Sequence, residues 1–230
     1  MRNLVSRAPH SIVQYIGSNH YSDYAGLLTG PFAGYDPNTA IEFNAYWAAD
    51  NGCFLPGYNP NRILSMLKRY QSIPKCLWIV VPDVVGDAAA TLQLFEAWIG
   101  TYRRYGYSTA FVAQNGIEQY RIPWDSFDCL FIGGDDEFKY SAVIREIASE
   151  AKRRGKWLHN GRVNTPERIL YSRSIGCDSF DGTHFTRVPA DVARYLPYQL
   201  TPINIARDTF MTHRKTRPAK LIATLPLFDN

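Results

Sequence analysis

Three aspartates, Asp50, Asp83 and Asp181, each stand just after a short apolar run of the chain. Two further runs of the same kind are followed by polar or glycine-rich turns, at Gln114 and at Gly133. One carboxylate can act as a nucleophile toward the anomeric carbon of a sugar, while a second moves protons. Asp, Gln and bare glycine amides also suit the edge of a purine, which offers both donors and acceptors. These residue types indicate glycosidic chemistry on a nucleoside.

Metal binding by the clustered carboxylates is the rival interpretation. No histidine lies beside Asp50, Asp83 or Gln114, although a magnesium ion would not need one. The four cysteines form no CxxC pair and no Cys-His pattern of a zinc site. We therefore expect no metal and no cofactor. A magnesium-dependent barrel hydrolase stays as an alternative, which predicts loss of activity with EDTA.

Short β-rich runs alternate with longer helical patterns from residue 76 onward. In the helical segments the apolar residues recur with spacings of three and four residues. The expected strands are Ile12–Ile16, Ala45–Ala49, Leu77–Val81, Thr109–Ala113, Cys129–Ile132, Lys156–His159 and Cys177–Phe180. The expected helices are Pro60–Tyr70, Asp87–Tyr105, Tyr140–Arg154 and Pro166–Ile175. Strands and helices that alternate in this way predict βαβ units around a parallel sheet.

Seven strands can be counted, and an eighth is expected near Glu42 or in Leu221–Leu225. This number of βα units predicts a compact α/β barrel of the TIM (β/α)8 type. We expect a single domain over residues 1–230, with a core at about 10–200 and a basic tail at about 205–230. A doubly wound open sheet is the alternative, and periodicity alone does not separate the two.

Composition excludes several classes of protein. The chain has 230 residues, of which 46% are hydrophobic and 14% aromatic, which argues against disorder. No run of 18 apolar residues is present, so we expect no membrane-spanning helix. The absence of a clear signal-peptide core and the unpatterned cysteines favour a cytoplasmic protein with reduced thiols. The net charge of +4 permits a nucleic-acid partner without requiring one.

Several short motifs, in order and spacing, resemble those of the tRNA-guanine transglycosylase superfamily, which exchanges guanine for a 7-deazaguanine base. The segment Arg162–Arg187 is similar to the family's GVG-TP-(E/D) turn, helix and RG-(V/I)-D-x-FD-C-(V/M)-x-PTR stretch. Asp50–Phe54 (DNGCF) resembles the family's DSGG(F/Y)Q, and Asp83 falls where the family has its base-reading Asp. The turns at 114–116 and 133–134 resemble the family's VQGG turn and its GGLAVGE turn, respectively. The resemblance covers roughly residues 45–190.

The resemblance implies a role for each matching residue. Asp181 would be the nucleophile that attacks C1′ of the target guanosine and forms a covalent glycosyl-enzyme intermediate, and Asp50 the general acid/base. Asp83 and Gln114 would bond the purine's edges. The Gly133-Gly134 backbone would complete the pocket. The target nucleotide must leave its stack for this chemistry.

Further contacts are expected at the edge of this pocket. Phe54 would sandwich the flipped base, as would Tyr140 or Phe185, although core packing explains each aromatic equally well. Arg187 would contact a phosphate, with a surface ion pair as the alternative. A basic cluster near the C-terminus would contact the nucleic-acid backbone through Arg214, Lys215 and Arg217.

The departures from the family pattern indicate which branch of the superfamily the chain resembles. No CxCxxC…H zinc site follows Asp181, so the barrel is expected to have no zinc-binding subdomain. A barrel without zinc resembles the DNA-modifying branch, the DpdA-like transglycosylases of phages and bacterial genomic islands. It implies DNA and a 7-deazaguanine base such as preQ0 as partners, together with partner proteins of a modification system. A transglycosylase acting on tRNA and a non-catalytic nucleic-acid or nucleobase-binding barrel remain the alternatives.

Overall fold

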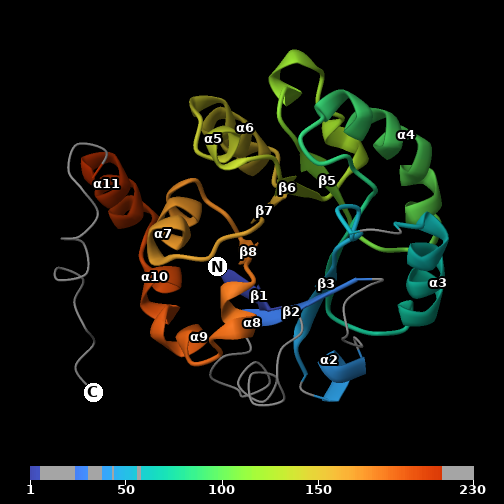
Figure 1. The fold of residues 1–230 in the computed structure, drawn as a ribbon, viewed down its shortest axis with the longest axis horizontal. Helices are drawn as coiled ribbons and strands as arrows, with labels where there is room; N and C mark the ends of the chain where they lie inside the picture. Colours follow the sequence, from blue (N-terminus) through green and yellow to red (C-terminus); the bar gives the residue numbers. More distant parts are fainter. Residues whose placement is uncertain (6–23, 31–37, 43, 56–57, 214–230) are drawn as a thin grey trace.

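The computed structural model describes residues 1–5, 24–30, 38–42, 44–55 and 58–213. Its strands form a closed parallel barrel in the order in which they occur along the chain. Figure 1 shows helices placed around the barrel strands. The strands are β1 (Arg2–Val5), β2 (Ala25–Thr29), β3 (Tyr46–Ala49), β4 (Cys76–Val80), β5 (Thr109–Ala113), β6 (Cys129–Ile132), β7 (Trp157–Asn160) and β8 (Ser179–Asp181). The expected TIM-type α/β barrel is thereby confirmed, and the open sheet is excluded because β1 pairs with both β2 and β8.

Helices and short 3-10 turns connect the strands. The longer helices are α3 (Pro60–Tyr70), α4 (Ala88–Arg104), α6 (Ala142–Arg153), α7 (Pro166–Ser174) and α11 (Ile203–His213). The shorter ones are α2 (Asn38–Glu42), α5 (Asp136–Lys139), α8 (His184–Arg187), α9 (Asp191–Arg194) and α10 (Leu196–Leu200), with 3-10 turns η1 (Ile117–Gln119) and η2 (Trp124–Ser126). All four helices predicted from periodicity are present, with shifts of two residues or fewer at their ends.

Local sequence signals explain where these helices begin. The carboxylate of Asp87 accepts a hydrogen bond from the backbone N–H of Ala90 and so caps α4. Ser141 caps α6 in the same way through the N–H of Ile144. Each cap satisfies a backbone donor that has no partner within the first helical turn. Asp87 thus starts α4 directly after the loop that follows β4, and Ser141 starts α6 after the short helix α5.

The two ends of the chain differ most from the sequence expectations. The expected strand Ile12–Ile16 lies outside the described residues, as does the candidate Leu221–Leu225. The candidate strand near Glu42 is wrong, because Glu42 ends a helix, α2. The barrel's first strand begins at Arg2, ahead of the core boundary expected near residue 10, and α11 extends into the region expected to be the basic tail.

Two apolar layers hold the barrel together. Residues that alternate along the strands fill the lumen, where small alanines on neighbouring strands leave space for the ring of Trp78. The ring of Phe131 lies 5.8 Å from that of Trp78, centroid to centroid. The other strand residues, including Phe111 and Leu130, pack outward against the helices. Because successive strand side chains point to opposite faces, this alternation also decides which polar residues point into the barrel.

Candidate active site at the barrel mouth

The predicted site residues converge on one end of the barrel. Asp50 directly follows β3, Gln114 follows β5 and Gly133 follows β6, while Asp181 is the last residue of β8 and Asp83 lies in the loop after β4. All the strands run parallel, so their carboxyl ends, and these residues with them, share one mouth.

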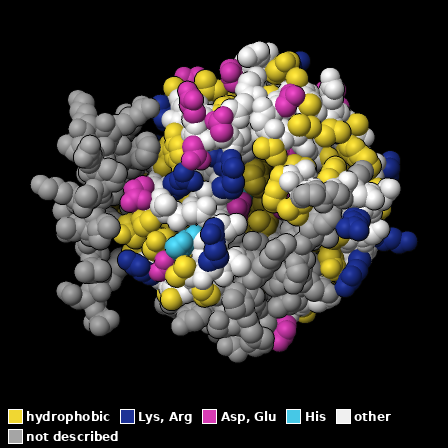
Figure 2. All heavy atoms as spheres, viewed as in Figure 1, with side chains coloured by type: hydrophobic (Ala, Val, Ile, Leu, Met, Phe, Trp, Pro, Cys, Tyr) yellow, Lys and Arg dark blue, Asp and Glu magenta, His cyan; other side chains and the backbone are white. Residues whose placement is uncertain are grey.

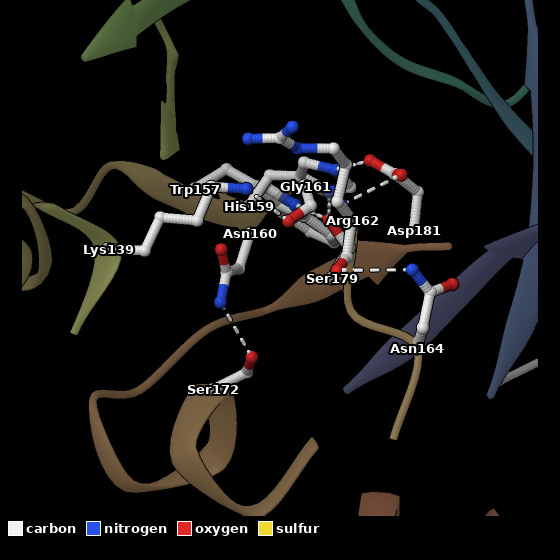
Figure 3. Close-up of polar contacts among 10 residues, drawn as sticks. All are labelled: Lys139, Trp157, His159, Asn160, Gly161, Arg162, Asn164, Ser172, Ser179 and Asp181. Atoms are coloured by element: carbon white, nitrogen blue, oxygen red, sulfur yellow. Dashed lines mark hydrogen bonds and ion pairs between the residues drawn. The ribbon is translucent and has the colours of Figure 1, made fainter. Parts of the chain in front are cut away.

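Asp181 is held by polar contacts from the neighbouring strand β7 and from the loop after it (Figure 3). Its Oδ2 lies 2.8 Å from Nε2 of His159, and its Oδ1 accepts a hydrogen bond of 3.1 Å from the backbone N–H of Arg162. The backbone carbonyl of Asp181 accepts a further hydrogen bond from the N–H of Val163. The carboxylate is mostly buried, with 16% of the side chain exposed. Such a fixed and partly exposed carboxylate is suited to act as a nucleophile.

His159 was not predicted as a site residue, although it lies at the centre of this network. It is fully buried in the barrel lumen, and burial lowers its pKa, against the opposing effect of Asp181. Its Nδ1 lies 2.8 Å from Oγ of Ser179, which also accepts a hydrogen bond from Nε1 of Trp157. Because side chains alternate along a strand, Trp157 and His159 lie on one face of β7, and Ser179 and Asp181 lie on one face of β8. Only the register between the two strands brings these pairs together, so the sequence alone did not reveal the contact.

Asp50 differs from an ordinary surface aspartate. Burial, together with the charges of Asp181 and Asp83, raises its pKa from 3.8 to about 7. Backbone N–H groups of Asn51 and Gly52 oppose this rise only in part. A carboxyl group that titrates near neutral pH can both donate and accept a proton under ordinary conditions. Asp50 therefore has the protonation behaviour expected of a general acid/base.

Asp83 and Gln114 bond to each other. Nε2 of Gln114 donates to Oδ2 of Asp83 at 2.7 Å, while Oδ1 of Asp83 accepts from Nδ2 of Asn51 and from Sγ of Cys53. Oε1 of Gln114 accepts from the backbone N–H groups of Gly86 and Gly134. Asp83 is 7% exposed and Gln114 is 2% exposed, so the pair forms the rigid floor of the mouth.

The two adjacent glycines make close backbone contacts that a side chain would prevent. A Cβ on Gly133 would lie 2.6 Å from Val112 Cγ1, and one on Gly134 would lie 2.5 Å from the ring of Phe138. Gly134 also has a φ of +72°, a conformation that favours glycine. Its carbonyl accepts a hydrogen bond from the guanidinium of Arg162. This bond ties the loop after β6 to the loop that holds Asp181.

Lys139 is a second buried group that the sequence did not single out. Its Nζ donates to the carbonyl of Gly161 at 2.6 Å, and only 3% of the residue is exposed. Burial, aided by the charge of Arg162, lowers its pKa to about 8, while Asp181 opposes this shift. A lysine at the end of a single-turn helix gives no periodic signal, which is why the sequence did not reveal it. Its position is visible in Figure 3 beside Gly161.

The remaining predicted residues lie farther out or outside the described chain. Phe54 is 65% exposed, and the guanidinium of Arg187 donates to Oγ1 of Thr183 at 2.8 Å. Of the other aromatics, Phe185 is fully buried in the outer core and Tyr140 packs on Tyr171. The three basic residues of the C-terminal cluster, Arg214, Lys215 and Arg217, lie outside the described residues.

The surface carries charges of both signs. Figure 2 shows Lys and Arg side chains interspersed with acidic and apolar ones on the face viewed. Over the described ranges, no three His, Cys, Asp or Glu side chains are grouped so as to hold a metal ion. In the same part of the chain, no helix has the length and hydrophobicity needed to cross a membrane.

Comparison with known proteins supports the fold and assigns neither a family nor an activity. No protein-family model matches the chain, and no curated protein matches it either. Among solved structures, the chain is similar to that of a mandelate oxidase mutant with benzaldehyde, with 10% sequence identity and a TM-score of 0.50. The match covers 90% of this chain and 70% of that one. At this identity the likeness shows that the two proteins share a barrel fold.

Proposed function

We propose that the protein is a base-exchange glycosyltransferase that replaces guanine in DNA with a 7-deazaguanine base such as preQ0. The observation that carries the proposal is the pairing of two unlike carboxyl groups at one mouth. Asp181 lies within hydrogen-bond distance of Nε2 of His159 and accepts a hydrogen bond from the backbone N–H of Arg162, while Asp50 has a pKa of about 7. Two carboxyl groups whose environments separate their roles are the usual basis of retaining glycosidic chemistry.

The reaction follows from these two roles. Asp181 attacks C1′, the C1′–N9 bond to guanine breaks, and the protonated Asp50 supplies the proton that the departing base takes up. A covalent ester between Asp181 and C1′ results. The incoming base then gives its N9 proton to the Asp50 carboxylate and attacks C1′, and the ester bond breaks to restore the Asp181 carboxylate. Two displacements at C1′ retain its configuration.

The floor of the mouth has hydrogen-bonding capacity left for a guanine-type base. Among the described residues, Gln114 uses one of its two amide N–H bonds on Asp83, which leaves one donor for a ligand. Oδ2 of Asp83 accepts one hydrogen bond from Gln114, so one acceptor position remains beside that donor. A donor next to an acceptor matches O6 and N1–H of guanine or of a 7-deazaguanine. Adenine presents the reverse order, so this floor discriminates against it.

Guanine exchange tests the proposal. Labelled guanine is offered with duplex DNA, single-stranded DNA and unmodified tRNA in parallel, alongside the near-isosteric Asp181→Asn variant. Label that enters DNA with the wild type and not with the variant is the expected result. Entry into tRNA alone would replace DNA by tRNA as the substrate. No label in any polymer, despite binding, would leave a barrel that binds nucleic acid without chemistry.

A further inference from the structure

We propose that His159 is a positioning residue for Asp181, a neutral imidazole whose Nε2–H donates to the nucleophile and whose tautomer is set by Ser179 and Trp157. The effect of this role on the reaction rests on the proposed function. The hydrogen-bond chain itself is a property of the folded protein. It links four side chains on two neighbouring strands, β7 and β8.

The direction of each hydrogen bond follows from what each group can do. The indole Nε1–H of Trp157 can only donate, so Oγ of Ser179 accepts this bond. The Ser179 hydroxyl is then free to donate its own hydrogen to Nδ1 of His159, 2.8 Å away. In the neutral imidazole that follows, the proton lies on Nε2, which faces Oδ2 of Asp181. A carboxylate accepts this bond, so every partner in the chain is satisfied.

The surroundings of His159 keep it in this state. Its ring lies 4.7 Å from the ring of Trp78 and 4.5 Å from that of Phe131, centroid to centroid. These apolar rings enclose the imidazole, and burial lowers its pKa. The charged groups that act on it are Asp181, which favours protonation, and Lys139, which opposes it.

The consequence for chemistry is a fixed carboxylate plane. The His159 donor holds Oδ2, and the Arg162 N–H holds Oδ1, so rotation of the carboxylate about its Cβ–Cγ bond breaks one bond or both. Both donors also stabilise negative charge on Asp181. This charge is lost when the ester to C1′ forms and returns when the ester bond breaks. Loss of the His159 donor should therefore slow breakdown of the ester more than its formation. His159 itself transfers no proton.

Nitrogen NMR of the histidine side chains tests the hydrogen-bond chain without any assay of activity. The full chain is labelled with ¹⁵N-histidine, and the His159 signals are assigned by their loss in His159→Gln. A neutral ring with the proton on Nε2 at pH of about 7 is expected, and Ser179→Ala should convert it into a mixture of tautomers. A proton on Nδ1, or a charged imidazolium, in the wild type would overturn the proposal.

Covalent trapping tests the chemical consequence. Wild type, His159→Phe and His159→Gln are mixed with the polymer that supports exchange, and the adduct is measured on denaturing gels during turnover. Phenylalanine has no donor, so exchange should fall about tenfold to a hundredfold while the fraction of enzyme held as adduct rises. Glutamine keeps an N–H donor near the position of Nε2 and should restore much of the rate, with KM for the polymer changed little in both variants.

The NMR and trapping experiments together distinguish failure of the proposed function from failure of the positioning role. The expected tautomer with no adduct and no exchange in the wild type would refute the proposed function and leave the hydrogen-bond chain intact. Wild-type adduct whose fraction is unchanged in His159→Phe would refute the positioning role. If His159→Phe does not fold, Ser179→Ala is used in its place, because it alters the tautomer and leaves the imidazole present.

Discussion

Nε2 of Gln114 donates a hydrogen bond of 2.7 Å to Oδ2 of Asp83, which joins the loop after β4 to the end of β5. Gln114 also accepts hydrogen bonds from two backbone N–H groups, those of Gly86 and Gly134. One buried amide thus connects three successive loops of the barrel mouth. In the proposed function, the order of donor and acceptor that remains on this pair would distinguish guanine from adenine.

Replacing this amide by a carboxylate should be costly. Gln114→Glu removes the donor to Asp83 and places a second negative charge against it in a site that is almost fully buried. We expect the free energy of unfolding at neutral pH to fall by about 3 kcal/mol, and the loss to shrink as the pH is lowered and a carboxyl becomes protonated. Urea unfolding at several pH values measures this. Gln119→Glu, on an exposed turn, is the matched control, and equal effects of the two changes would contradict the paired geometry.

In the proposed base exchange, the pKa of Asp50 should give the two half-reactions opposite pH dependences. Formation of the adduct needs the protonated acid, so its rate should fall about tenfold per unit above pH of about 7. Attack by the incoming base needs the carboxylate, so its rate should fall about tenfold per unit below the same pH. Rapid quench of each half-reaction measures the two profiles. Asp50→Asn should be slow and lack both slopes, and wild-type profiles that are flat across pH 7 would exclude Asp50 as the acid/base.

Two glycines with opposite surroundings test the packing of the loop around Asp181. A Cβ on Gly182 would lie 2.3 Å from the carbonyl oxygen of Val163, a backbone atom that cannot rotate away. Gly182→Ala should therefore destabilise the fold by about 2–4 kcal/mol. A Cβ on Gly100, inside the helix α4, would have nothing within 4 Å of it, so Gly100→Ala should stabilise by up to about 1 kcal/mol. Thermal unfolding compares the two, and a tolerated Gly182→Ala would show that this loop is loosely packed.

The sequence predicted the elements that carry strong local patterns. Apolar runs such as Thr109–Ala113 and capped, periodic helices such as the one that follows Asp87 are readable without the fold. The first two strands were not predicted at their positions. Arg2–Val5 has two polar residues followed by two apolar ones, which is neither an apolar run nor an alternating pattern. Its pairing with β8 closes the barrel across most of the chain. Closure between distant segments leaves no local pattern.

In the candidate site, too, local patterns could be read from the sequence and contacts between distant segments could not. The residue types at the mouth, Asp50, Asp83 and Asp181, were visible because polar residues follow apolar runs. The partners of these residues were not visible, because they depend on register. His159 reaches Asp181 only because β7 pairs with β8 so that His159 lies opposite Ser179. A single step in that register would turn the imidazole toward the helices.

Lys139 should make stability depend on pH in the alkaline range. Its pKa is about 8 in the folded protein, lowered from 10.5 chiefly by burial, so the unfolded chain binds more protons between these values. Its contribution to the free energy of unfolding therefore rises from pH of about 8 to about 10.5, by as much as about 3 kcal/mol in total.

The variant Lys139→Met keeps the stem of the side chain and removes the titrating group. Relative to wild type, it should lose stability steadily as the pH rises through that range, because only the wild type gains from releasing the buried proton. Urea unfolding of both proteins at several alkaline pH values measures the difference. Lys68→Met, on the exposed face of α3, controls for the loss of a positive charge, and the effect of Lys139→Met is compared with it at each pH. A difference between Lys139→Met and wild type that stays constant would show that Lys139 keeps its proton at the carbonyl of Gly161 throughout.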